Sequence, residues 1–253
     1  MLRAILRNAG FHPRRLACAL GGWRRYVRTR EEFRNMAAST PMPWGAELPI
    51  LTEWDEPAGS PGAYFYQDQL VARWIHEANP SRHVDVGSRL DGFIGSLSVF
   101  REVEVLDIRP QPLPVPNVRF HQLDLMRPLP AEWIACTDSL SCLHTLEHFG
   151  LGRYGDPVDP DGHLKGLEQL KQMPAPGGRF YLSTPVGTPR IEFNAHRVFA
   201  PETVLDWFGE GWEIERSAVA DDTCLAAESR DAGALAGYSG GLAVGIVAAR
   251  RGR

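Results

Sequence analysis

Hydrophobic and polar positions alternate in a regular order from Tyr64 to the end of the chain. Apolar residues first recur at steps of three and four, which predicts a helix that ends at Asn79-Pro80, because a residue before proline avoids the α region. Short apolar runs bounded by turn residues then alternate with helical patterns. Strands are predicted at 83–86, 103–108, 118–123, 138–143, 179–183, 212–219 and 242–249, and helices at 164–173 and 201–208. Seven strands with interleaved helices predict a doubly wound, mostly parallel α/β sheet.

The connection between the second and third predicted strands has an unusual composition. Nine residues separate Ile108 from Val118, and four of them are prolines. Parallel neighbours normally need a crossover of about a dozen residues, usually a helix. Proline-rich chain extends by about 3.1 Å per residue, so this segment can return along a short strand without a helix. An extended crossover is therefore expected here.

Length and charge divide the chain into two parts. Its 253 residues are enough for one large domain, predicted at 48–253, after a basic extension and Pro/Gly-rich lead-in at 1–47. Residues 1–35 hold nine arginines against Glu31 and Glu32, whereas the whole chain has a net charge of −4. The remainder is therefore acidic and lacks the clustered basic residues of a nucleic-acid-binding surface.

The N-terminal segment and the cysteines bear on location. The apolar run 16–20 is too short for a signal-peptide core or a membrane span. The four cysteines form no CxxC pair and are typical of free thiols in a reducing compartment. A cytoplasmic protein is expected. Its basic start is interpreted as resting on the acidic remainder of the chain or in weak peripheral contact with a membrane.

The stretch HVDVGSRLDGFIG, residues 83–95, predicts a ligand-binding turn after the first strand. In an open α/β sheet, ligands bind at the carboxyl ends of the strands. Gly87 lets the backbone leave the strand sharply, and Gly92 and Gly95 permit a close approach of ligand and helix. Asp107 ends the second strand 20 residues after Gly87, where an acid can accept both hydroxyls of a ribose. Asp124, which ends the third strand, is either a neighbour of a bound purine or a turn former.

These motifs resemble two known groups of proteins. The order VDVGSRLDGFIG, VEVLDIRP, FHQLDLM, DSLSCLHTLEHFG and MPAPGGRFYLSTPVG is similar to that of class I S-adenosylmethionine-dependent methyltransferases. Four motifs resemble, over roughly residues 48–210, the family named domain of unknown function 268 (DUF268): GAYFYQDQLVARWI, GSRLDGFIG, LGRYGDPVDPDGHLKGL and FNAHRVFAPE. The first resemblance implies a Rossmann-like methyltransferase fold that binds S-adenosylmethionine.

The same resemblance implies where the cofactor lies. Gly87 would lie beside its methionine part, Asp107 on its ribose and Asp124 near its adenine. Residues that hold or line the cofactor are predicted to be Asp85, Gly87, Ser88, Arg89, Gly92, Asp107, Ile108, Asp124 and Leu125, with Tyr64 and Gln67 from the preceding helix. Ser88 and Arg89 stand where the family has a second glycine. We therefore expect Arg89 or Asp91 to pair with the carboxylate or amino group of the cofactor.

The chemistry is expected in the segment LHTLEHFG, which follows the fourth strand. His144, Glu147 and His148, with the later His196, are the candidate catalytic residues. In one interpretation, a histidine or carboxylate takes the acceptor's proton during methyl transfer. In a second, the four side chains bind a divalent metal ion that activates an acceptor hydroxyl. In a third, Glu147 and His148 only hydrogen-bond the loops around the cofactor.

Methyl transfer from S-adenosylmethionine to an oxygen of a small-molecule or glycan acceptor is the expected function, because histidine and carboxylate suit the deprotonation of a hydroxyl. Two alternatives stay open. One is a non-catalytic module that binds a cofactor or a partner through the same fold. The other is an NAD-binding oxidoreductase, since a ribose-binding acid after a glycine turn also serves dinucleotides.

Overall fold

The protein is described by a computed structural model that covers residues 10–36, 43–54, 59, 61–112 and 114–253. The chain divides into two compact units, Met1–Ser60 and Pro61–Arg253. In the first, α2 (Pro13–Met36) packs against the extended segment 43–54, where Glu47 lies 3.0 Å from Arg30 and 2.9 Å from Arg34. Among the helices of the described residues, none is both long and apolar enough to cross a lipid bilayer.

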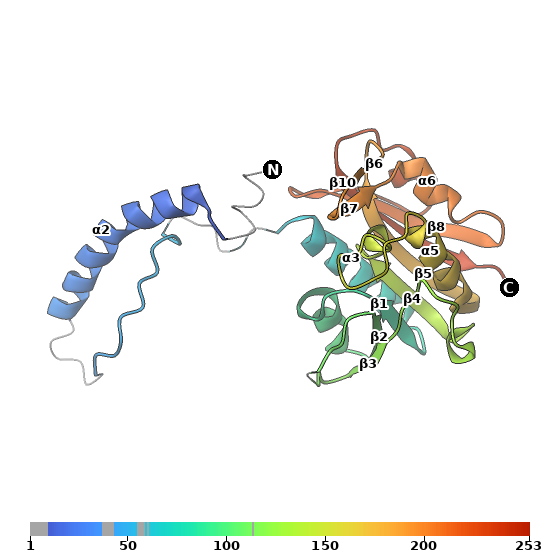
Figure 1. The fold of residues 1–253 in the computed structure, drawn as a ribbon, viewed down its shortest axis with the longest axis horizontal. Coiled ribbons are helices and arrows are strands. Elements are labelled where there is room, and N and C mark those ends of the chain that lie inside the picture. Colours follow the sequence, from blue (N-terminus) through green and yellow to red (C-terminus); the bar gives the residue numbers. More distant parts are fainter. Residues whose placement is uncertain (1–9, 37–42, 55–58, 60, 113) are drawn as a thin grey trace. The chain divides into compact units, whose positions relative to one another are not determined.

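The described part of Pro61–Arg253 contains one eight-stranded sheet (Figure 1). Its strands, in spatial order, are β3 (Val118–Gln122), β2 (Val103–Asp107), β1 (His83–Val86), β4 (Thr137–Leu143), β5 (Pro174–Val186), β10 (Ala243–Arg251), β8 (Trp212–Ala220) and β9 (Leu225–Ser229). The first five are parallel, whereas β10 runs antiparallel to both β5 and β8, and β9 runs antiparallel to β8. The predicted doubly wound, mostly parallel sheet is confirmed.

The prediction of seven strands was wrong by one, because β9 forms the edge of the sheet. Its sequence, LAAES, has no β-branched or aromatic residue, and its side chains alternate only between half-buried and exposed. Such a strand leaves almost no hydrophobic pattern in the sequence. A separate hairpin of β6 (Arg190–Glu192) and β7 (His196–Val198) was also not predicted.

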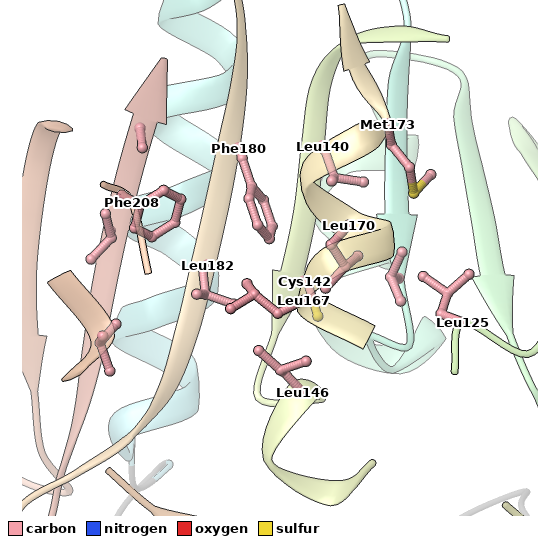
Figure 2. Packing of buried hydrophobic residues seen from close by; sticks show 14 of the residues in the cluster. Leu125, Leu140, Cys142, Leu146, Leu167, Leu170, Met173, Phe180, Leu182 and Phe208 are labelled. Atoms are coloured by element: carbon pink, nitrogen blue, oxygen red, sulfur yellow. The ribbon is translucent and has the colours of Figure 1, made fainter. Parts of the chain in front are cut away.

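Two hydrophobic clusters cover the two faces of the sheet. Neighbouring residues on one strand belong to different clusters, as Phe180 and Tyr181 do on β5, since side chains alternate across a strand. One face is covered by α3 (Ala63–Ala78), the turn η2 (Leu90–Ile94) and α4 (Gly95–Ser98). The other is covered by α5 (Gly162–Gln172), α6 (Pro201–Asp206) and α7 (Gly233–Ala236). Figure 2 shows Leu167 and Leu170 of α5 beside Leu140 and Cys142 of β4.

The crossover between β2 and β3 follows the prediction. Residues 109–112 and 114–117 contain no helix, yet β2 and β3 pair in parallel from Val103 opposite Val118 to Asp107 opposite Gln122. The short return brings the carboxyl ends of β1, β2 and β3 to one edge of the sheet. The candidate site is formed at this edge.

Candidate functional site

A cavity of about 660 Å³ lies at the carboxyl ends of β1 to β4. Its volume is within the range of small-molecule binding sites, roughly 300–1,000 Å³. Most of the predicted residues line it: Tyr64, Gln67, Gly87, Ser88, Arg89, Gly92, Asp107, Ile108, Asp124, Leu125, His144, His148 and His196. Residues from six segments of the chain, up to 132 positions apart, therefore meet in one cavity.

The turn after β1 needs glycine at position 87. Gly87 has a φ of +74°, and a Cβ placed there would lie 2.3 Å from Cγ2 of Thr145. Its N–H donates to the carbonyl of Leu106 on β2 at 2.8 Å. The turn therefore combines a left-handed backbone with a close approach that excludes any side chain.

Asp85 does not line the cavity and lies fully buried beneath this turn. Its carboxylate accepts hydrogen bonds from Ser88 N at 3.0 Å, Ser88 Oγ at 2.9 Å and Ser141 Oγ at 2.5 Å. Burial raises the pKa of Asp85 to about 7, although these hydrogen bonds act in the opposite direction. In this structure Asp85 shapes the backbone of the turn and does not face the cavity.

Arg89 and Asp91 form an exposed ion pair at the cavity rim. The guanidinium Nε and Nη2 of Arg89 lie 2.9 and 2.6 Å from the two carboxylate oxygens of Asp91. The side chains are 80% and 71% exposed. A ligand carboxylate or amino group that paired with either side chain would compete with this contact, which screening by water makes weak.

Asp107 lies at the end of β2 and faces the cavity, as predicted, but it is paired with Arg109. Its Oδ1 accepts from Arg109 N at 2.8 Å and from Nε at 2.9 Å, while Oδ2 accepts from Nη2. The Arg109 guanidinium lies 4.5 Å from the centroid of the Tyr154 ring. Three of about four lone-pair positions on the carboxylate are thus occupied. A ribose at Asp107 would share the acid with Arg109 or displace it.

Asp124 is a turn former that also lines the cavity. Its carboxylate accepts from Met126 N at 2.9 Å, as a turn former does, and lies 3.2 Å from Arg127 Nε. It also lines the cavity together with its neighbour Leu125.

The histidine-rich segment after β4 forms the opposite wall. Glu147 is fully buried in the turn η4 (Leu146–His148), and its Oε1 lies 2.9 Å from His144 Nδ1 and 3.7 Å from His148 Nε2. Burial acts to raise the pKa of Glu147, but the two imidazoles beside it lower the pKa overall. His144 is held with a φ of +50°, in the strained left-handed region for a residue other than glycine. The Tyr64 hydroxyl lies 3.1 Å from its Nδ1.

His148 has the geometry of a neutral base. Its Nδ1 lies 2.7 Å from the Ala195 carbonyl, which can only accept a hydrogen bond, so Nδ1 carries the proton and Nε2 is left with a lone pair. Burial lowers the pKa of His148, which keeps the imidazole neutral at pH 7. A proton taken up at Nε2 would be stabilised by the buried carboxylate of Glu147.

The metal hypothesis gains no support from this arrangement. In the part of the chain that the structure describes, no group of three or more His, Cys, Asp or Glu side chains could hold a metal ion. The fourth candidate ligand, His196, lies on β7, and its Nε2 is 3.3 Å from Glu192 of the same hairpin. The carboxylate of Glu147 lies close to one ring nitrogen of His144 and one of His148.

Several residues of the site were missed by sequence reasoning. Asp68, Arg109, Arg153 and Tyr154 line the cavity. Asp156 also lines it and holds the loop after η4 by accepting from the N–H groups of Gly150, Gly152 and Tyr154 at 2.8, 3.1 and 3.0 Å. The sequence did carry one signal of this tightly folded loop, namely the three glycines that follow His148. Gly150, Gly152 and Gly155 all adopt positive φ values, which glycine allows most readily.

Arg197 holds the same loop through hydrogen bonds to its backbone carbonyls. It is only 4% exposed, and its Nη1 donates to the carbonyls of Glu147 and Phe149 at 3.1 and 2.7 Å. Its Nη2 donates to the carbonyl of Pro160 at 3.1 Å. One buried guanidinium thus ties both ends of the cavity-lining loop together.

Comparison with known proteins agrees with this architecture. The family described as Caenorhabditis protein of unknown function, DUF268, matches residues 124–215. A comparison with curated proteins gives no match. The fold is similar to 1,6-didemethyltoxoflavin-N1-methyltransferase of Burkholderia thailandensis, solved with 1,6-didemethyltoxoflavin and S-adenosylhomocysteine, at 15% identity and a TM-score of 0.53 over 96% of this chain and 92% of that chain. It is also similar to the N-methyltransferase NodS of Bradyrhizobium japonicum in complex with S-adenosylhomocysteine, at 16% identity and a TM-score of 0.50, over 88% of this chain and 98% of that chain.

The family match begins at Asp124, well after the start of the resemblance predicted at residue 48, and ends near the predicted residue 210. It includes the histidine-rich segment, the loop that Asp156 holds and the hairpin that carries His196. Residues 124–215 thus match the DUF268 family, and the fold of the chain is similar to that of two solved methyltransferases.

Proposed function

We propose that the protein transfers a methyl group from S-adenosylmethionine to an oxygen atom of a small-molecule or glycan acceptor. The observation that supports the proposal is the 660 Å³ cavity, which is lined by Gly87 after β1, Asp107 at the end of β2 and His148. The space beside Gly87 suits a group that must approach the backbone closely. Asp107 offers a carboxylate at the end of β2, where an acid can bind the hydroxyls of a ribose.

The chain's own residues would orient the acceptor and remove its proton. The sulfonium of S-adenosylmethionine supplies an activated methyl group, so the protein contributes alignment and proton transfer. His148 Nε2 would accept the hydroxyl proton while the acceptor oxygen bonds to the methyl carbon, the sulfur–methyl bond breaks and S-adenosylhomocysteine leaves. Glu147, 3.7 Å away, stabilises the imidazolium that forms. His144 and Tyr64 enclose the same end of the cavity.

Turnover in a cell extract tests the proposal. Purified protein, a methyl-labelled cofactor and extract should give S-adenosylhomocysteine and a labelled product. His148→Ala should lower the rate by about 10²- to 10⁴-fold, the usual contribution of a general base, while affinity for S-adenosylhomocysteine is retained. The control is His163→Ala, since His163 packs on Phe199 outside the cavity and should leave the rate unchanged.

Two results would redirect the proposal. Tight cofactor binding with no turnover in any extract would favour a non-catalytic binding module. Loss of turnover on addition of EDTA, restored by a divalent metal, would revive the metal hypothesis for His144, Glu147, His148 and His196. The observed geometry leads us to expect no effect of EDTA.

A further inference from the structure

Five aspartates line the cavity, and one of them differs from the others in its partners. Four are neutralised by an arginine or by backbone N–H groups: Asp91 by Arg89, Asp107 by Arg109, Asp124 by Arg127, and Asp156 by three amides of its own loop. The fifth is Asp68, in the second turn of α3.

Asp68 has no such neutralising partner. Among the described residues, the only hydrogen bond to its carboxylate comes from a neutral amide, Gln67 Nε2, at 3.0 Å from Oδ1. No arginine or lysine of the described chain lies within ion-pair distance of it. Partial burial raises the pKa of Asp68, although the hydrogen bond from Gln67 and the nearby imidazole of His144 act in the opposite direction.

The orientation of Gln67 is determined by a chain of hydrogen bonds. Its Oε1 accepts from Ser183 Oγ at 2.6 Å, and that hydroxyl in turn accepts from His144 N at 3.0 Å. Because the hydroxyl proton is used toward Oε1, the amide nitrogen of Gln67 must point to Asp68. Gln67 is 2% exposed, so the pair is held rigidly at the cavity wall.

The free oxygen of Asp68 faces the turn after β1. A Cβ built on Gly92 would lie 3.1 Å from Asp68 Oδ2. The carboxylate of Asp68 therefore lies next to the turn, and a side chain at position 92 would come close to it. Asp68, Gly87 and Gly92 line the same cavity. On the proposed function, the methionine part of the cofactor would lie on this side, beside Gly87.

We infer that Asp68 binds the α-ammonium group of S-adenosylmethionine. The inference rests on the proposed function and assigns the residue that recognises the amino-acid end of the cofactor. An ammonium group carries three N–H donors and a full positive charge, whereas Asp68 Oδ2 offers unused acceptor positions. A charge-assisted hydrogen bond at a partly buried site is stronger than the water contacts it replaces.

Binding of two nucleosides separates this role from a structural one. S-adenosylhomocysteine carries the amino-acid part, whereas 5′-methylthioadenosine has the same nucleoside and sulfur without it. Calorimetry should show that Asp68→Asn weakens S-adenosylhomocysteine by about 10- to 100-fold, the range for a hydrogen bond to a charged group. Affinity for 5′-methylthioadenosine should stay within about twofold. Glu77→Gln, which removes an acid from the same helix outside the cavity, should change neither affinity.

Other outcomes would overturn the inference in distinguishable ways. Equal weakening of both nucleosides by Asp68→Asn would show that the residue only supports the fold of the cavity. Weakening of S-adenosylmethionine but not of S-adenosylhomocysteine would assign Asp68 to the sulfonium instead. Unchanged affinity for all three compounds would remove Asp68 from recognition and leave the proposed function intact. Failure of the wild-type protein to bind any of them would remove the proposed function itself, and the inference with it.

Discussion

Two buried titratable groups on β1 should make the stability of the protein depend on pH in opposite directions. His83 and Asp85 are 1% and 0% exposed and are linked through Ser141, whose Oγ lies 3.1 Å from His83 Nε2 and donates to Asp85 Oδ2. Burial lowers the pKa of His83 to about 3 and raises the pKa of Asp85 to about 7. Both groups are therefore held neutral over much of the acidic range.

The signs follow from proton binding. An unfolded aspartate ionises near pH 3.8, so the stability from neutral Asp85 is fully present below that pH and is lost as pH rises to about 7. A pKa change of roughly three units corresponds to about 4 kcal/mol. An unfolded histidine gains a proton below pH 6.5 while His83 stays neutral, so its contribution is lost as pH falls from 6.5 toward 3. Between about pH 4 and 6.5, rising pH therefore lowers the unfolding free energy through Asp85 and raises it through His83.

Asp85→Asn should leave only the pH dependence of the unfolding free energy that comes from His83. The amide can keep an acceptor toward Ser88 N and donate to a serine hydroxyl, so the turn is preserved. Relative to wild type, the variant should gain about 4 kcal/mol of unfolding free energy as pH rises from about 4 to 7, and His83→Gln should show the reverse trend. Urea unfolding followed by tryptophan fluorescence at four pH values measures this difference. A difference between Asp85→Asn and wild type that does not change with pH would refute the reasoning.

Three further predictions concern the turn, the loop and the N-terminal helix. Gly87→Ala should lower the free energy of unfolding by about 2 kcal/mol or more, because the new Cβ meets Thr145 and the φ is left-handed; addition of Thr145→Ser, which removes Cγ2, should recover part of the loss in urea unfolding. Arg197→Met should cost about 3 kcal/mol and weaken S-adenosylhomocysteine in calorimetry, since buried carbonyls lose their donor; unchanged stability would contradict this role. Weak peripheral membrane contact stays a prediction, for which Leu20 and Trp23 of α2, 69% and 50% exposed, are the candidate residues. Binding to anionic vesicles in a flotation assay should fall with Leu20→Glu. Absence of wild-type binding would contradict the prediction.

Much of the fold could be predicted from the sequence because the signals are local. The strand 83–86 was predicted at its observed bounds, since a short buried strand reads as an apolar run between turn residues. The glycine turn and Asp107 were found at the cavity for the same reason: parallel strands place their carboxyl ends at one edge of a sheet. The edge strand β9 was missed because a half-buried edge leaves little hydrophobic pattern.

Tertiary structure alone decided which polar groups meet. Asp85 and Asp107 both belong to buried strands that precede turns, yet Asp85 points beneath its turn to Ser141, 56 positions away, while Asp107 faces the cavity. Asp68 becomes a candidate ligand only because Gln67 is held by Ser183, 116 positions along the chain. Local sequence determines secondary structure through backbone and burial preferences. The partners of a side chain depend on contacts between distant segments, and those arise only when the sheet is assembled.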